Sequence, residues 1–182
     1  MFRELLFNEF RPYATLTDPQ LDRLERHYNA LVRWNQTLNL TRIKGIHDVV
    51  RYHYCESLYL GLKLPPGPLR IVDVGSGAGF PGVPISILRP DLDVTLIESH
   101  QRKAVFLRES SDVRVLPMRA ENCTERFDWI VARAVSPESV LKLKVSPNYA
   151  LLVSSKHSTE KLPWGNDRAV VFHVEQSCGK IP

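Results

Sequence analysis

The chain of 182 residues contains only three cysteines, and they follow no recognisable pattern. Cys55, Cys123 and Cys178 are far apart and odd in number, which argues against a disulfide framework and against a cysteine-ligated metal site. Scattered cysteines of this kind are typical of proteins from a reducing compartment. We therefore expect a cytoplasmic protein that holds no metal ion.

Long hydrophobic runs are also absent. No apolar stretch reaches the roughly 20 residues that a membrane-spanning helix requires. The N-terminal residues MFRELLFNEFRPY include acids, which do not fit a signal peptide. Hydrophobic residues make up 43% of the chain and charged residues 24%, which is ordinary for a globular protein. We expect one globular unit, monomeric, without a membrane partner.

Positive charge is in only slight excess, with a formal net charge of +4. Residues 64–99 hold two basic and four acidic residues, whereas the segments on either side are basic overall. An acidic middle suits a small cationic ligand, and basic flanks that include Arg33, Arg42 and Lys44 suit a polyanion. A solvated surface without any partner would show the same mild bias.

The most informative stretch is LRIVDVGSGAGFPG, residues 69–82. Its first five residues predict a short buried strand that ends in Asp73, and Pro81 marks the start of a helix. Between them lie three glycines at alternate positions, Gly75, Gly77 and Gly79. Glycine lets the backbone bend sharply and approach a ligand closely, and we expect the first amides of the helix to point unpaired at that ligand. The pattern predicts a site for a nucleotide-like molecule.

Two ligands fit this turn, and an ordinary strand–helix turn without a ligand is a third interpretation. The G-x-G-x-x-G spacing from residue 77 matches a dinucleotide fingerprint, which favours NAD. S-adenosylmethionine (SAM) is favoured by Asp73, because a carboxylate at the strand tip accepts hydrogen bonds from an ammonium group that SAM has and NAD lacks. SAM is also favoured by VTLIE, residues 94–98, a second strand whose Glu98 is placed to accept both ribose hydroxyls.

After Pro68 the chain alternates between strand and helix patterns, which predicts an α/β, Rossmann-like fold with a mostly parallel sheet of six to seven strands and helices on both faces. The expected strands are residues 69–73, 93–98, 113–116, 127–132, 149–153 and 169–174, the last at an edge or antiparallel. The expected helices are residues 81–89, 101–109 and 136–144. Ligands of such sheets lie over the carboxyl ends of the strands, where Asp73, Glu98, residues 119–121 and Arg133 would converge.

The N-terminal part predicts a helical cap over residues 1–64, ahead of a ligand-binding core over residues 65–182. Thr17 and Gln20 have the spacing of a capping box at a helix start. Residues 34–43, WNQTLNLTRI, are typical of a loop or helix end, which either packs or forms a polar rim beside the cofactor cleft. Apolar residues spaced four apart, Ile46, Val50, Tyr54, Leu58 and Leu62, predict a further helix.

Two motifs that base methyltransferases use are missing from the chain. Methylation of an exocyclic base amine usually employs an Asn/Asp-Pro-Pro-aromatic loop after the fourth strand, where this chain reads ARAVSP. Methylation of a base carbon needs a cysteine nucleophile, and no cysteine directly follows the fourth or fifth strand. A ring nitrogen with a free lone pair, such as guanine N7, needs no general base, so orientation alone lowers its barrier. The lack of an acid–base pair agrees with that acceptor.

Several segments together carry a resemblance to a known family. WNQTLNLTRI, RYHYCESL, VDVGSGAGFPGVPISILRPDLDVTLIES, KAVFLRE, RAEN and VARAVSP resemble, in order, the bacterial small-subunit rRNA guanine-N7 methyltransferases, also called glucose-inhibited division protein B. The likeness covers most of residues 30–137. It implies transfer of a methyl group from SAM to N7 of a guanine in 16S rRNA, with the rRNA or the small ribosomal subunit as partner.

The resemblance and the turn together assign the site. The expected cofactor-binding residues are Asp73, Gly75, Ser76, Gly77, Gly79, Phe80, Glu98, Ser99, Ala120, Glu121 and Arg133. Asp73 and the glycines would hold the methionine part, Glu98 the ribose and residues 120–121 the adenine edge. Arg133 is the expected catalytic residue, because it would lie where cofactor and target base meet. The expected substrate-binding residues are Asn35, Asn39, Arg51, His53 and Lys156.

The chain also departs from the family pattern. RYHYCESL has Glu56 where the family usually has Asp, the helix before the third strand is shortened at residues 109–112, and Lys156 lacks its usual neighbouring Gly. Two alternatives therefore stay open beside the methyltransferase: an NAD-dependent oxidoreductase, and a non-catalytic RNA-binding relic of the family.

Overall fold

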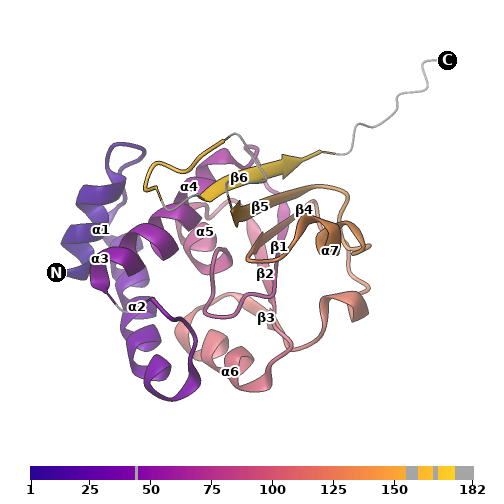
Figure 1. The fold of residues 1–182 in the computed structure, drawn as a ribbon, viewed down its shortest axis with the longest axis horizontal. Coiled ribbons are helices and arrows are strands. Elements are labelled where there is room, and N and C mark those ends of the chain that lie inside the picture. Colours follow the sequence, from indigo (N-terminus) through magenta and orange to yellow (C-terminus); the bar gives the residue numbers. More distant parts are fainter. Residues whose placement is uncertain (44, 155–159, 166–167, 175–182) are drawn as a thin grey trace.

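Six strands form one sheet in the computed structural model, which describes residues 1–43, 45–154, 160–165 and 168–174 (Figure 1). The strands are β1 (Arg70–Val74), β2 (Asp93–Ile97), β3 (Arg114–Leu116), β4 (Trp129–Arg133), β5 (Tyr149–Ser154) and β6 (Arg168–His173). Their order is β3-β2-β1-β4-β5-β6, with β1 to β5 parallel and β6 antiparallel to β5. The predicted Rossmann-like α/β sheet and its antiparallel last strand are confirmed.

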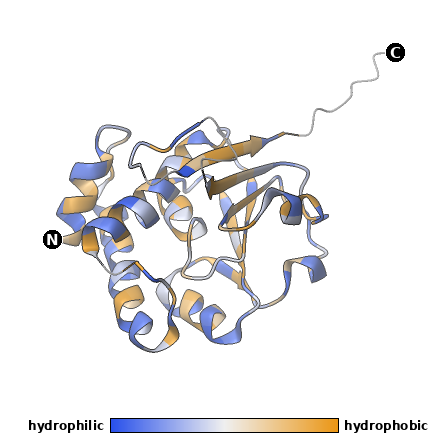
Figure 2. Cartoon of the chain, viewed as in Figure 1, coloured by the Kyte–Doolittle hydropathy of each residue, from blue (hydrophilic) through white to orange (hydrophobic). Residues whose placement is uncertain are grey.

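Helices cover the two faces of this sheet unequally. The helices are α1 (Phe2–Phe10), α2 (Asp18–Leu38), α3 (Ile46–Val49), α4 (Glu56–Lys63), α5 (Gly82–Leu88), α6 (Gln101–Ser110) and α7 (Pro137–Leu141). Residues of α1, α2 and α4 to α6 share one buried cluster with alternate strand residues such as Ile71, whereas Val72 faces the opposite side, where α7 contributes Val140. Successive strand residues point to opposite faces, so both faces of the sheet are apolar (Figure 2).

The long helix α2 ties the N-terminal helices to the sheet. It begins at the predicted capping box, where the Thr17 N–H donates to Gln20 Oε1 at 2.9 Å. The amide of Gln20 in turn donates to the Ile87 carbonyl of α5 at 3.1 Å. The helix end expected within residues 34–43 is confirmed, because α2 ends at Leu38 and Asn39 follows as its C-cap. Tertiary packing overrides the weak helix propensity there: Trp34 meets the Phe106 ring edge-on, with centroids 6.0 Å apart.

The helix expected from Ile46 onwards is interrupted. Between α3 and α4, residues Val50–Cys55 form a π-helical turn. The burial pattern fits a π-helical turn, because Val50, Tyr54 and Leu58 are all buried. In a regular α-helix, residues spaced four apart would move progressively away from a single face. The wider turn keeps them in the core and brings Tyr52 and His53 to the sheet.

No helix among the described residues is both long and apolar enough to cross a membrane.

Candidate cofactor site

The glycine turn follows β1 and lies at the carboxyl ends of the parallel strands. Its three alternate glycines have positive φ angles of 71°, 56° and 89° at Gly75, Gly77 and Gly79, a region that other residues rarely adopt. At Gly79 a Cβ atom would also lie 2.8 Å from Val83 Cγ2 and 2.9 Å from His27 Nε2. The turn therefore requires glycine for its shape, and at Gly79 for its packing as well.

Asp73 lies beneath this turn and is fully buried. Its Oδ2 accepts a hydrogen bond from the Gly82 N–H at 2.9 Å, while its Oδ1 has no partner among the described residues. Burial raises the pKa of Asp73 to about 7, although the bond from Gly82 opposes this shift. The carboxylate thus caps α5 from inside the protein.

The expectation that the first amides of α5 are unpaired is wrong. Gly82 N–H donates to Asp73, Val83 N–H donates to the Gly79 carbonyl at 2.8 Å, Pro84 has no N–H, and Ile85 N–H donates to the Pro81 carbonyl at 3.2 Å. A phosphate at a helix N-terminus relies on free amides of this kind. Here an internal carboxylate occupies that position, so the helix start does not offer a pyrophosphate site.

Glu98 joins the end of β2 to the glycine turn. Its Oε2 accepts the Gly77 N–H at 2.8 Å, and its Oε1 accepts the His100 N–H at 2.7 Å. The residue is 7% exposed, and the neighbouring Ser99 is exposed. Glu98 therefore lies at the edge of the turn with both oxygens directed by backbone amides.

Phe80 connects the turn to the N-terminal helices. The His53 ring stacks on the Phe80 ring with centroids 4.7 Å apart and planes 12° apart. His53 Nε2 lies 2.7 Å from Thr41 Oγ1, and the amide of Asn35 holds Thr41 through its backbone N–H and C=O. Burial lowers the pKa of His53 to about 3, helped by Arg133 and Arg168, so its ring is neutral. Of the expected substrate residues, His53 thus contacts the expected cofactor residue Phe80 directly, and Asn35 is linked to His53 through Thr41.

Arg133 lies at the end of β4 with its side chain only 12% exposed. Its Nη1 donates to the Tyr52 carbonyl and lies 3.4 Å from Glu56 Oε2. The same carboxylate oxygen lies 2.8 Å from Arg168 Nε of β6. Burial lowers the pKa of Arg133 to about 10 and raises that of fully buried Glu56 to about 7, although the two arginines oppose the shift at Glu56. The arrangement fixes the guanidinium of Arg133 between β4 and the π-helical turn.

The other expected site residues are less closely joined to the turn. Ala120 and Glu121 form a short 3-10 turn after β3, half-buried and exposed respectively. Asn39 is exposed and ends α2 in the left-handed conformation, with φ 45°. Arg51 donates from Nε and Nη2 to Glu9 Oε1 of α1, at 2.9 and 2.6 Å, so a structural ion pair already uses its guanidinium. Lys156 lies outside the described residues.

A pocket of about 770 Å³ opens beside the C-terminal end of α2. It is lined by apolar residues such as Leu31 and by the polar side chains of Asn35, Asn39, Thr41 and Arg42. Asn35 and Asn39, two of the expected substrate residues, therefore line one cavity, next to the contact of Thr41, His53 and Phe80.

Three site residues were missed in the sequence. Glu56 was noticed only as a departure, Arg168 was not singled out, and Thr41 appeared only as loop material. A carboxylate within the apolar stripe RYHYCESL was the available signal for Glu56, because a buried acid requires a partner. Its partners could not be named, since β4 and β6 lie far along the chain.

Sequence comparison shows the family to which the chain belongs. The model of the family described as rRNA small subunit methyltransferase G matches residues 20–166. A protein of Roseiflexus sp. (strain RS-1), named ribosomal RNA small subunit methyltransferase G, is 36% identical over 179 residues, covering 91% of this chain and 74% of that protein. The protein of the same name from Chromobacterium violaceum is 43% identical over 129 residues, covering 66% of this chain and 61% of its own length.

Among solved structures, magnesium protoporphyrin IX methyltransferase from Synechocystis PCC 6803, with bound SAH, superposes with a TM-score of 0.51 at 13% identity. The match covers 76% of this chain and 73% of that one, and it supports the fold alone. The family match over most of the chain is the stronger finding. The chain belongs to the rRNA small subunit methyltransferase G family.

Proposed function

We propose that this protein transfers a methyl group from SAM to N7 of a guanine in 16S rRNA. The observation that carries the proposal is the glycine turn with its two carboxylates, in a chain of this family. We further propose that it acts as a cytoplasmic monomer, with residues 1–64 as a cap beside the cofactor.

The donors and acceptors of the turn suit SAM better than NAD. The amides at the start of α5 are already bonded, which disfavours a pyrophosphate. The buried Oδ1 of Asp73 lacks a partner, and Glu98 lies at the rim of the turn. The hydroxyls of a ribose would complement the Glu98 carboxylate, whereas the buried Asp73 acts from beneath the turn. In this proposal Glu98 accepts the ribose hydroxyls, and Asp73 sustains the shape of the turn beneath the methionine part.

The reaction requires positioning and little acid–base chemistry. Bound SAM supplies an electrophilic methyl group on a sulfonium, and the N7 lone pair carries no proton that must be removed. The residues of this chain therefore have to orient and to exclude water. Arg133, fixed by Glu56 and the Tyr52 carbonyl, would set the edge of the site at which the base approaches. The neutral His53 ring, stacked on Phe80, would form an apolar wall.

The proposal is tested by a cofactor titration followed by an incorporation assay. Calorimetry should detect binding of SAM and no binding of NAD at the same concentration. Methyl-labelled SAM should then label 16S rRNA from cells that lack the endogenous methylation. Binding of NAD in preference to SAM would point to the oxidoreductase. RNA binding without labelling would point to the non-catalytic relic, and either result would overturn the proposal.

A further inference from the structure

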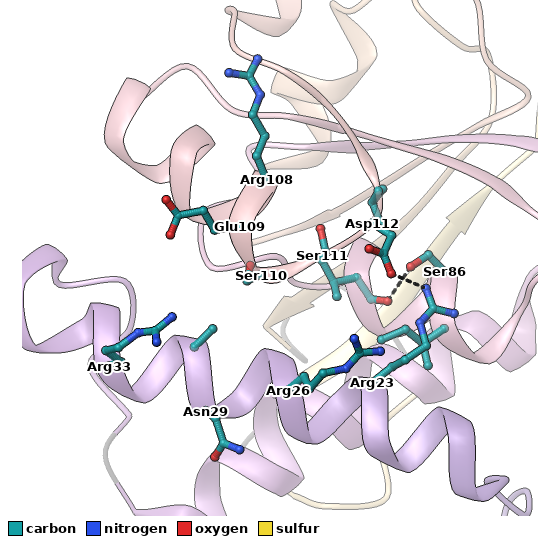
Figure 3. A pocket seen from close by; sticks show the side chains of 14 residues that line it. Arg23, Arg26, Asn29, Arg33, Ser86, Arg108, Glu109, Ser110, Ser111 and Asp112 are labelled. Atoms are coloured by element: carbon teal, nitrogen blue, oxygen red, sulfur yellow. Dashed lines mark hydrogen bonds and ion pairs between the residues drawn. The ribbon is translucent and has the colours of Figure 1, made fainter.

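A second pocket, of about 330 Å³, lies between α2 and the C-terminal end of α6 (Figure 3). Four arginines line it, Arg23, Arg26 and Arg33 from α2 and Arg108 from α6. Only two acids, Glu109 and Asp112, accompany them, so the charged lining is basic overall. Arg33, one of the basic residues that suit a polyanion, belongs to this lining, and none of the expected cofactor residues does.

The arginines of this pocket lie away from the glycine turn, which the lining approaches only at Val83 of α5. Helix α6 begins at Gln101, just after the carboxyl end of β2, and ends at Ser110, just before the amino end of β3. Since β2 and β3 are parallel, the C-terminal end of α6 lies near the amino ends of the strands, whereas the cofactor site lies at their carboxyl ends. A ligand in this pocket would not touch the methyl group that is transferred.

The arginines of the pocket are largely unengaged. Arg26, Arg33 and Arg108 make no hydrogen bond or ion pair with any residue that the structure describes, and Arg23 lies 3.9 Å from Asp112 Oδ2. Figure 3 shows the side chains of Arg23, Arg26 and Arg33 on the side of α2 that faces α6, whereas the guanidinium of Arg108 points away from α2. Guanidinium groups that are held on a rigid helix and outnumber the acids beside them favour phosphate as a ligand.

The arrangement of the arginines favours a chain of phosphates over one small anion. Arg23 and Arg33 are ten residues apart on one helix, which corresponds to about 15 Å, and the small side chain of Ala30 lines the pocket between Arg26 and Arg33. A single phosphate could not contact such a row. The lining also contains no aromatic side chain on which a base could stack, so it suits a backbone better than a nucleobase.

We propose that Arg23, Arg26 and Arg33, with Arg108 at the border, form a backbone-binding groove that holds the sugar-phosphate chain of the rRNA at a distance from the target guanine. The proposal rests on the proposed function, because it takes rRNA as the substrate. Helix α2 leads from this groove to Asn35 and Asn39 at its C-terminal end, so RNA that follows α2 would approach the cofactor site.

The test compares a groove variant with a control of equal charge change. The groove variant is R23Q/R26Q/R33Q, and the control is R126Q/K142Q/K144Q, which removes three positive charges beside α7 on the other face of the sheet. Binding of protein-free 16S rRNA is measured between 50 and 300 mM KCl. The slope of log K against log [KCl] should fall by about two for the groove variant, at roughly 0.7 per single-strand phosphate contact, and stay at the parent value for the control.

Kinetics separate this groove from the catalytic site. In the groove variant the KM for rRNA should rise about tenfold, while kcat at saturating RNA and the affinity for SAM should match the parent. The single variant Glu109→Gln should tighten RNA binding, because it removes an acid from the lining. Thermal melting of each variant checks folding.

The outcomes are distinguishable. Parent-like salt slope and KM in a folded groove variant that still transfers methyl groups would overturn the groove and leave the proposed function intact. Loss of affinity for assembled small subunits without any loss for protein-free rRNA would indicate a protein contact and would also overturn it. A reduced slope together with no methyl transfer by the parent would support the groove and refute the proposed function.

Discussion

Replacing Gly79 by alanine tests whether the glycine turn is held by packing as well as by backbone shape. Gly79 has φ 89°, and its Cβ would lie 2.8 Å from Val83 Cγ2 and 2.9 Å from His27 Nε2. The left-handed conformation costs an L-residue about 1–2 kcal/mol, and the added methyl group in a filled site costs about 1–3 kcal/mol more. We expect Gly79→Ala to lower the free energy of unfolding by about 2–5 kcal/mol.

Gly67→Ala is the matched control. Gly67 also has a positive φ, 101°, but a Cβ there would meet nothing within 4 Å. The control therefore pays the conformational cost without the clash. Urea denaturation of both variants should give a difference of about 1–3 kcal/mol, and the melting temperature should fall by about 2–4 °C for each kcal/mol. Equal losses in the two variants would refute the claim that packing fixes the turn at Gly79.

Three further predictions concern the site. Asp73 has a pKa of about 7 in the folded protein against an ordinary 3.8. Its contribution to the free energy of unfolding is therefore present below pH 4 and is lost as the pH rises to 7. The free energy of unfolding of Asp73→Asn, relative to the parent, should rise over this range by up to about 4 kcal/mol. Denaturation at pH 4.5 and 7.5 checks this, and a pH-independent difference would contradict it. Glu98→Ala should weaken SAM binding by about 1–2 kcal/mol in calorimetry. An affinity equal to that of the parent would show that the ribose does not bind at Glu98. Arg133→Lys should fold but lose single-turnover transfer, because an ammonium cannot keep the contacts of Nη1 with the Tyr52 carbonyl and Glu56 and also present a planar guanidinium to the site. Full activity would remove Arg133 from the site.

Local patterns explain how much of the fold was predictable. The strands around residues 69–73 and 93–98 are short apolar runs between turn residues, and each lies within about one residue of β1 and β2. The capping box at Thr17 and the antiparallel edge strand were equally readable. These features depend on neighbours in the chain, which is why sequence alone predicted them.

Contacts between distant segments were not predictable. The π-helical turn at Val50–Cys55 had no signal in its local sequence, and the contact of Trp34 with Phe106 of α6 joins segments about 70 residues apart. The carboxylate of Asp73 was expected to face a ligand, but it caps Gly82 from inside the core. Glu56 gained its importance only when β4 and β6 brought two arginines to it.

The atom that receives the methyl group tests the central claim most directly. The parent protein would react in a single turnover with labelled SAM and 16S rRNA that lacks the endogenous methylation. One aliquot of the product would be digested to nucleosides, and another would be cleaved chemically at N7-methylguanine. We predict that the label lies in N7-methylguanine at one position. Label in another base, on an exocyclic amine or on ribose would contradict an enzyme that orients a ring nitrogen without a general base.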